Sequence, residues 1–542
     1  MANAFFKVPA PKNEPILAYA SGSKERKLLD ATIKEMKSTS VDIPMTIGGE
    51  KIFTNNKISI HPPHELKHTL GHYSQGNKTH VAKAIEAALE AKQGWEDMAW
   101  QDRAAIFLKV ADLISGPYRQ KIAAATMLGQ GKNIYQAEID SVAELADFMR
   151  FNVQYMTQLY NEQPGSSDLI WNRMEHRPLE GFIFALTPFN FTAIAANLCA
   201  APAMLGNVIV WKPSDDQIYS AGLLMEIFER AGLPKGVINL VFTDGPEAGE
   251  VIFKHKDLAG LHFTGSTGVF KTLWRTIGEN IDIYKSYPRI VGETGGKDFV
   301  VAHKSADAQE VATALVRGSF EFSGQKCSAA SRAYIPASMW DAVRSMMEKD
   351  LAEIKTGTPE DYTNYVNAVI NERSFDKIAA YIEQAKSDSN AELIMGGSYS
   401  KAEGYFVEPT VILAKDADYR TMCEEIFGPV LTVYVYEDEQ YEDILKVVDN
   451  TSPYALTGSI FAIEREAINV AVKALRHSAG NFYINDKPTG AVVGQQPFGG
   501  GRGSGTNDKA GSILNLLRWV SPRTIKETFV PATNYNYPSF EK

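Results

Sequence analysis

The sequence predicts an α/β fold with a doubly wound parallel sheet. From about residue 181, short apolar runs alternate with helical stretches, which is the order of βαβ units. Polar residues directly follow these runs, and ligands bind at that edge of parallel sheets. A second alternating block, from about residue 293 to 498, predicts a further α/β unit.

The N-terminal part is predicted to be irregular at first and then helical. The first 60 residues are polar and show no clear periodicity. Apolar side chains at helical spacing then predict helices over 81–89, 106–114 and about 137–151.

Apolar runs predict the strands of the first sheet at residues 182–186, 208–211, 237–242 and 258–263. The longest apolar run, 193–211, contains Asn, Pro and Gly, so it favours a buried helix and a strand over a membrane span. We therefore expect ligands to contact the strand ends at 187–191, 212–215 and 264–268. The last 40 residues contain an apolar cluster at 513–519 and an aromatic tail.

Composition excludes several classes of partner. The chain has 542 residues, with 55 basic and 65 acidic side chains and a net charge of −10. Without a long basic run, neither a nucleic acid nor an anionic membrane is an expected partner. The N-terminus has no signal or transit pattern, so we expect a cytoplasmic protein, or a mitochondrial-matrix protein if it is eukaryotic. Three distant cysteines predict no disulfide, and Cys199 and Cys423 are expected to be plain buried thiols.

Two patterns resemble ligand sites but are interpreted otherwise. His61, His64, His68 and His72 could share a helix face, but no acidic residue or cysteine completes a metal set there. We expect a solvated surface and no metal. The glycine-rich stretch 499–505 matches no nucleotide-binding spacing, and we interpret it as a tight, mobile turn.

The chemistry is predicted at Cys327, which lies among small and polar residues beside Lys326. A neighbouring cation favours the reactive thiolate, although a cysteine of this kind taken alone is more often structural. Glu293, flanked by Gly292 and by Gly295, lies 34 residues upstream. Asn190 follows a predicted strand, where its amide can donate to a ligand.

These motifs, in this order, resemble the aldehyde dehydrogenase superfamily over nearly the whole chain. The motifs are Asn190, Lys212, Gly265-Ser266, Glu293, Cys327, Glu424-Glu425-Ile426-Phe427-Gly428-Pro429 and Pro497-Phe498-Gly499-Gly500. Segments 293–299, 324–329, 481–487 and 493–500 resemble the branch that oxidises L-glutamate γ-semialdehyde, the open form of 1-pyrroline-5-carboxylate, to L-glutamate in proline degradation.

The resemblance implies a catalytic set of three residues. Cys327 would attack the aldehyde to give a thiohemiacetal and then a thioester. Asn190 and the Cys327 backbone N–H would stabilise the oxyanion. Glu293 would activate the water that hydrolyses the thioester. Relatives that transfer the acyl group to coenzyme A do not need this base, so a free acid is the expected product.

The resemblance also implies NAD as cofactor. Lys212 would contact the adenosine ribose, Ser266 the pyrophosphate and Glu425 the nicotinamide ribose. Asp215 would repel a 2′-phosphate and so favours NAD over NADP. The expected cofactor-binding residues are Thr187, Pro188, Phe189, Lys212, Ser214, Gly265, Ser266, Thr294, Glu425 and Phe427.

The substrate residues implied by the resemblance are Glu144, Phe191, Ser328, Gly490, Ala491 and Phe498. Ser328 and the 489–491 loop would hold the α-carboxylate, although Ala491 has no hydroxyl where some relatives have Ser. Glu144 would face the α-ammonium, and a solvated helix carboxylate is the alternative. Phe191 and Phe498 would enclose the aliphatic middle, or simply pack in the core.

The same resemblance implies three parts of the fold. These are a Rossmann-like NAD-binding domain (1–162 and 181–292), an α/β catalytic domain (293–505), and a small β flap with the C-terminal tail (163–180 and 506–542). The flap implies a homodimer or homohexamer, since a lone hairpin is unstable. The length leaves no room for a fused proline dehydrogenase. The alternatives are a dehydrogenase for another semialdehyde and a non-catalytic structural homologue.

Overall fold

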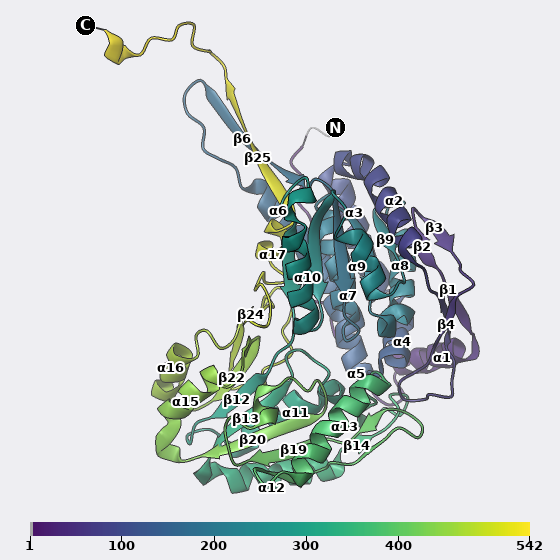
Figure 1. Ribbon diagram of the computed structural model, residues 1–542, viewed down its shortest axis with the longest axis vertical. Coiled ribbons are helices and arrows are strands. Elements are labelled where there is room, and N and C mark those ends of the chain that lie inside the picture. Colours follow the sequence, from purple (N-terminus) through teal and green to yellow (C-terminus); the bar gives the residue numbers. More distant parts are fainter. Residues whose placement is uncertain (1–3, 542) are drawn as a thin grey trace.

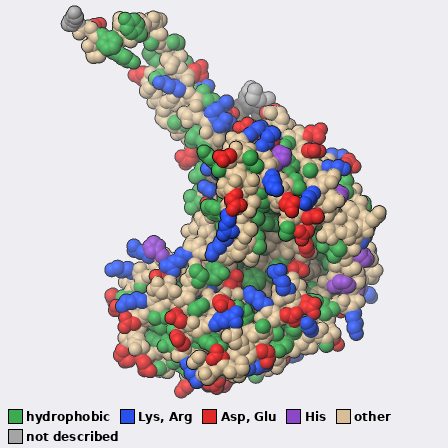
Figure 2. Space-filling model, in the orientation of Figure 1, with side chains coloured by type: hydrophobic (Ala, Val, Ile, Leu, Met, Phe, Trp, Pro, Cys, Tyr) green, Lys and Arg blue, Asp and Glu red, His purple; other side chains and the backbone are tan. Residues whose placement is uncertain are grey.

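The computed structural model describes residues 4–541, which form two α/β bodies and a projecting two-stranded arm (Figure 1). Each body is built around a seven-stranded sheet whose central strands are parallel. The predicted α/β fold is therefore confirmed. Figure 2 shows that the surface is hollowed where the two bodies meet.

The first sheet has the order β11-β10-β7-β8-β9-β2-β3. Strands β7 to β11 run parallel, and β2 and β3 complete one edge in antiparallel orientation. The strands are β2 (Met45–Ile47), β3 (Glu50–Ile52), β7 (Phe182–Thr187), β8 (Val208–Pro213), β9 (Ile238–Leu240), β10 (Leu258–Thr264) and β11 (Arg289–Glu293). The four strands predicted for this sheet are thus present, with β9 shorter than expected.

Helices cover both faces of this sheet (Figure 1). They are α2 (Lys78–Asp97), α3 (Trp100–Ser115), α4 (Arg119–Gln130), α5 (Ile134–Ala137), α6 (Leu145–Asn161), α7 (Thr192–Met204), α8 (Ile218–Ala231), α9 (Gly245–Ile252) and α10 (Thr267–Glu279). A π-helical turn, η1 (Glu138–Glu144), precedes α6. The long apolar run is the buried helix α7 followed by β8, as the sequence indicated. No helix within residues 4–541 is long and apolar enough to cross a membrane.

The expectation of irregular structure holds for residues 4–23 and was wrong for residues 24–60. They form α1 (Lys24–Ser38), β1 (Val41–Ile43), β2, β3 and β4 (Lys57–Ile60), and β1 and β4 flank β5 (Gly71–Ser74) in a small sheet. Helix α1 buries only Leu29 and Ile33, which leaves a weak periodic pattern. The strands have three or four residues each, too few for alternation to emerge.

The histidine interpretation was also wrong in part. The four histidines do not share a helix: His72 lies in β5, and His64 is buried with neither ring nitrogen hydrogen-bonded. Folding brings Glu360 to 3.6 Å from the His64 ring, but Lys37 already pairs with Glu360 and Glu65 at 2.7 and 2.6 Å. The cluster is therefore a partly exposed ion-pair network beside the buried His64.

The second sheet has the order β16-β19-β20-β13-β12-β22-β23, parallel except for the edge strand β16. Its strands are β12 (Asp298–Ala302), β13 (Ala330–Pro336), β16 (Ala391–Met395), β19 (Thr410–Ala414), β20 (Val430–Tyr436), β22 (Thr457–Phe461) and β23 (Asn481–Ile484). The helices packed on it are α11 (Ala308–Phe320), α12 (Ala337–Glu353), α13 (Glu372–Ser387), α15 (Tyr441–Asn450) and α16 (Arg465–Ala474).

The arm consists of β6 (Ile170–Pro178) and β25 (Val520–Thr528), which pair antiparallel over nine residues each. The short helix α17 (Ile513–Leu517) leads into β25 and packs on α6. Trp171, Leu169 and Phe529 are at least half exposed on the arm. The arm therefore presents apolar side chains to solvent in the single chain.

Candidate active site

A cavity of about 290 Å³ lies between the two bodies and brings the predicted substrate residues together with Cys327 and Glu293, whereas Asn190 is not among the residues that line it. Strand β11 contributes Glu293 at its carboxyl end, and the turn before β13 contributes Cys327. The residues from the predicted set that line this cavity are Glu144, Phe191, Glu293, Cys327, Ser328, Gly490, Ala491 and Phe498.

The Cys327 turn is held in an unusual backbone conformation. Phe322 and Ser323 have φ of 51° and 54°, a region that costs non-glycine residues energy. Gly324 has φ 67°, and a Cβ there would lie 2.1 Å from the Gly428 carbonyl oxygen, so only glycine fits. The Gln325 side chain accepts a hydrogen bond from the Ile370 N–H at 2.8 Å. The strain is thus fixed by surrounding contacts, and it positions the thiol.

The prediction that Lys326 favours a Cys327 thiolate was wrong. The Lys326 ammonium instead pairs with Glu321 at 2.9 Å. Burial, together with the carboxylates of Asp298, Glu293 and Glu425, raises the pKa of Cys327 above its usual range. The resting thiol is therefore protonated, and its proton must leave as the sulfur attacks.

Glu293 faces the cavity beside Cys327. Its Oε2 accepts a hydrogen bond from the Gly500 N–H at 3.3 Å. Burial raises the pKa of Glu293 well above the usual range, while Lys509 lowers it. A carboxyl group with a raised pKa can accept a proton near neutral pH, as a general base must.

Asn190 lies at the turn between β7 and α7 and is 4% exposed. Its amide nitrogen donates to the backbone oxygen of Gln325 at 3.1 Å, which joins this turn to the Cys327 turn. Asp140 accepts hydrogen bonds from the N–H groups of Thr192 and Ala193 at the start of α7, and Lys132 pairs with Asp140 at 2.7 Å. The start of α7, which directly follows the Asn190 turn, is therefore fixed by a buried ion pair.

Sequence reasoning missed Lys132 and Asp140, which are fully buried and adjoin the cavity. The Lys132 ammonium lies 3.9 Å from the centre of the Phe191 ring, a favourable cation–π distance. Asp140 lies in a helical stretch and Lys132 in the loop before it, where charged residues normally face solvent, so no sequence signal marked them. Arg317, Glu321 and Lys487 also line the cavity and were missed.

The predicted carboxylate anchor has a defined geometry. The hydroxyl groups of Ser328 and Thr489 lie 2.8 Å apart, and both residues are buried. Gly490 has φ 98°, and the Lys487 ammonium donates to the Thr489 carbonyl oxygen at 3.0 Å. Hydroxyls, loop N–H groups and a nearby cation together suit an anion.

Glu144 lies at the end of η1 and faces the same cavity. Burial and the neighbouring Asp140 raise the pKa of Glu144 to about 8, against the opposing effect of Lys132. Glu144 is partly exposed and lines the ligand cavity, so its contact with the α-ammonium stays a prediction.

The residues predicted for the adenosine side lie at the ends of β7 and β8. Lys212 is buried on β8, and its ammonium lies 3.4 Å from Asp215, whose side chain is 59% exposed. Thr187 accepts a hydrogen bond from the Trp211 indole at 2.9 Å, and the Ser214 N–H donates to the Thr187 carbonyl oxygen. The ends of β7 and β8 thus lie side by side and carry the Lys212 ammonium and the Asp215 carboxylate.

The pyrophosphate residues lie at the start of α10. Ser266 is the N-cap of α10, so the first N–H groups of that helix point to this position. Gly265 is required by close packing, since a Cβ would lie 2.7 Å from the Phe263 ring. The Gly265 N–H donates to the Glu293 carbonyl oxygen at 3.1 Å, which connects this turn to the catalytic strand.

The residues predicted for the nicotinamide side come from both bodies. Glu425 accepts a hydrogen bond from the Gly296 N–H at 3.0 Å, and burial raises its pKa. Phe427 has φ 63°, and its ring packs edge-on against Phe189 of the first body at 5.9 Å. Thr294 donates to the Gly503 carbonyl oxygen at 2.6 Å, and Pro188 precedes Phe189 in the β7 turn.

Comparison with known proteins decides the family, since the aldehyde dehydrogenase family model matches residues 53–525. The chain belongs to the aldehyde dehydrogenase family. This dehydrogenase is 50% identical to the mitochondrial delta-1-pyrroline-5-carboxylate dehydrogenase of Dictyostelium discoideum, over 98% of this chain and 96% of that protein. The predicted family is therefore confirmed.

Two solved structures resemble the dehydrogenase over most of its length. The delta-pyrroline-5-carboxylate dehydrogenase of Mycobacterium tuberculosis, bound with NAD, is 51% identical and superposes with a TM-score of 0.96, covering 100% of both chains. The 1-pyrroline-5-carboxylate dehydrogenase from Thermus, also with NAD bound, is 30% identical with a TM-score of 0.89, covering 97% of this chain and 100% of that one.

Two cysteine expectations have different outcomes in the dehydrogenase. Cys199 is fully buried in α7, as expected. Cys423 is only partly buried, and its sulfur donates to the Asp418 carbonyl oxygen at 3.4 Å, so the expectation of a plain buried thiol was wrong for it. The glycine-rich stretch is packed at its start, where Gly499 and Gly500 are buried, and not a free turn.

Proposed function

We propose that this aldehyde dehydrogenase oxidises L-glutamate γ-semialdehyde to L-glutamate, with NAD as the hydride acceptor, in proline degradation. The observation that carries the proposal is a single cavity lined by the thiol of Cys327, the carboxyl group of Glu293, an anion site at Ser328 and Thr489, and the carboxyl group of Glu144. Cys327 matches the aldehyde and Glu293 the water-dependent step. Ser328 and Thr489 match the α-carboxylate of the same substrate, and Glu144 matches its α-ammonium.

The first half-reaction forms the acyl enzyme. The Cys327 sulfur attacks the aldehyde carbon, and the thiol proton is released to solvent. The carbonyl oxygen gains negative charge, for which we propose the Asn190 amide and the Cys327 N–H as donors; one such donor contributes about 2.7–4 kcal/mol. Loss of hydride from the thiohemiacetal carbon then gives the thioester.

The second half-reaction releases the product. Glu293 takes a proton from water, and the oxygen of that water attacks the thioester carbonyl. The carbon–sulfur bond breaks, Cys327 regains a proton, and the product leaves as a free carboxylate. The sum is aldehyde, NAD⁺ and water converted to carboxylate, NADH and two protons.

The residues at the strand ends fit a dinucleotide. Buried Lys212 at the end of β8, the capped start of α10 and the Glu425 carboxylate supply a cation, helix N–H groups and a ribose acceptor. Asp215 is too exposed to be neutralised fully by Lys212, and it disfavours a 2′-phosphate. When bound, NAD supplies the hydride acceptor.

The function is tested with purified protein, NAD and 1-pyrroline-5-carboxylate, by following NADH absorbance and by identifying glutamate as the product. We expect turnover with this substrate, and at least tenfold lower kcat/KM with butanal, which has no α-amino-acid head. Equal kcat/KM for the two aldehydes would favour a dehydrogenase for another semialdehyde. The absence of turnover with either would favour the non-catalytic alternative.

Replacing Glu144 with Gln is expected to weaken substrate use and to stabilise the empty enzyme. Loss of the ammonium partner should lower kcat/KM by about ten- to a hundredfold, mainly through KM. The pKa of Glu144 rises on folding from 4.5 to about 8, so ionisation opposes folding as pH rises across that window. The Tm of the variant should exceed that of wild type at pH 8.5, and the gain should vanish below pH 4.5.

Steady-state kinetics and thermal unfolding at several pH values check this expectation. Glu353, exposed on α12, provides the matched control, because Glu353→Gln removes a solvated carboxylate only. A Glu144→Gln variant with unchanged KM would remove Glu144 from the substrate site.

The assembly, the domain division and the cellular location of the enzyme are also proposed. The exposed apolar arm of β6 and β25 supports a homodimer or homohexamer in which the arm packs on a second copy. The division into NAD-binding, catalytic and flap domains remains a prediction. Cytoplasmic location also stays a prediction, beside a Dictyostelium relative whose name includes "mitochondrial".

A further inference from the structure

The glycine-rich stretch 499–505 packs directly on the general base. The Gly500 N–H donates to Glu293 Oε2 at 3.3 Å, and the Gly499 carbonyl oxygen accepts from the Lys509 ammonium at 2.9 Å. That N–H and that carbonyl belong to the same peptide group. One peptide therefore joins the cation of Lys509 to the carboxyl group of Glu293.

This bridge is held rigidly at both ends. The Lys509 ammonium also donates to the Gly480 carbonyl oxygen at 2.7 Å and to Asn481 Oδ1 at 3.4 Å, while the Gly499 N–H donates to the same Asn481 oxygen at 3.2 Å. A Cβ on Gly499 would lie 3.0 Å from Glu293 Oε1, and one on Gly500 would lie 2.8 Å from the Leu456 backbone. The glycines allow the peptide to approach the base.

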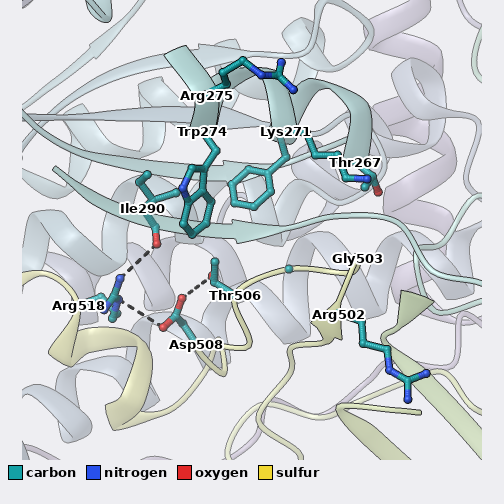
Figure 3. A pocket seen from close by; sticks show the side chains of 12 residues that line it. Thr267, Lys271, Trp274, Arg275, Ile290, Arg502, Gly503, Thr506, Asp508 and Arg518 are labelled. Carbon is teal, nitrogen blue, oxygen red and sulfur yellow. Dashed lines mark hydrogen bonds and ion pairs between the residues drawn. The ribbon is translucent and has the colours of Figure 1, made fainter. Parts of the chain in front are cut away.

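The charges around Glu293 act in opposite directions. Lys509 lowers the pKa of Glu293, and Asp508 raises it. Asp508 faces away, toward Arg518 at 3.4 Å and Thr506 at 2.5 Å, on the wall of a surface groove beside α10 (Figure 3). Lys509 is thus the cation that offsets the burial of the base, and the polarised peptide strengthens its effect.

We propose that Lys509 is a positioning residue for hydrolysis: through the Gly499–Gly500 peptide it orients the carboxyl group of Glu293 and favours its ionised form. The proposal rests on the function proposed above, in which Glu293 activates water. Without the cation, a smaller fraction of Glu293 is ionised at a given pH. The hydrolysis rate should then fall on the acidic side of the pH profile.

The test compares Lys509→Met, Lys509→Gln and Lys509→Arg by the pH dependence of kcat and of single-turnover thioester hydrolysis. Gln can still donate to the Gly499 oxygen but has no charge, so it separates charge from scaffolding. We expect the acidic limb of the pH profile to move up by about one pH unit in Lys509→Met and Lys509→Gln, which is about a tenfold loss of rate at pH values below the limb. In Lys509→Arg the limb should stay near its wild-type position. Asp508→Asn should move the acidic limb to lower pH.

Several results bear on the outcome. Lys446, fully exposed and paired with Asp443, gives the control Lys446→Met, whose profile should match wild type. If Lys509→Met does not bind NAD and is therefore misfolded, the pH profiles of Lys509→Gln and Asp508→Asn test the proposal instead. Unshifted profiles in folded Gln and Met variants would overturn the proposal. A wild-type enzyme that does not turn over 1-pyrroline-5-carboxylate would instead overturn the proposed function.

Discussion

Replacing Cys327 with Ala should abolish NADH formation from 1-pyrroline-5-carboxylate, with kcat reduced by about 10⁴-fold or more. Hydride cannot leave the aldehyde carbon until a nucleophile makes it tetrahedral, and Cys327 is the thiol that lines the cavity with Glu293. NAD affinity should be unchanged, because the predicted cofactor residues lie on other turns. The measurement is steady-state kinetics together with NAD titration by fluorescence.

The matched control is Cys423→Ala, which removes a partly buried thiol with a single hydrogen bond to the Asp418 carbonyl. This variant should keep most of the wild-type rate. Turnover that persists in Cys327→Ala, or is lost equally in Cys423→Ala, would contradict the assignment of the nucleophile.

Replacing Glu293 with Gln should stop the reaction after the first half. Acylation and hydride loss can proceed, but water is no longer deprotonated, so kcat should fall about 10²- to 10⁴-fold. Rapid mixing should show a burst of NADH equal to the enzyme concentration. Mass spectrometry of the quenched mixture should find the glutamyl fragment joined through a thioester to the peptide that contains Cys327.

Glu424 provides the control for this variant, because its exposed carboxylate pairs with Arg420 at 2.9 Å and faces away from the cavity lining. Glu424→Gln should show wild-type turnover and no trapped adduct. If Glu293→Gln neither gives a burst nor accumulates the adduct, Glu293 acts before the thioester forms, and its main role is to accept the thiol proton of Cys327.

The strands of the first sheet were predictable because they depend on local patterns, whereas the catalytic set was predicted from the order of family motifs. Buried parallel strands appear as continuous apolar runs, and their polar ends mark the ligand edge. Helix α1 was missed since only Leu29 and Ile33 of its fifteen residues are buried. The strands near the N-terminus were too short for their alternation to be visible.

The electrostatics of the site could not be predicted in the same way. Sequence adjacency suggested that Lys326 activates Cys327, but a side chain pairs with the charge that folding brings nearest, which is Glu321. Likewise, Asp140 lies in a helical stretch and Lys132 in the loop before it, where charged residues normally face water. Only the packing of η1 against the start of α7, together with the Lys132–Asp140 ion pair, places these two side chains in the interior.

The sequence by itself determined the family, the α/β fold and the residue types available for a thiol-based oxidation, because these follow from motif order and from hydrophobic patterns along the chain. The tertiary structure raises the pKa values of Cys327, Glu293 and Glu144, and it joins Lys509 to Glu293 through the Gly499–Gly500 peptide. The physical reason is that pKa depends on desolvation and on charges nearby in space, and both are fixed by contacts between residues far apart in sequence.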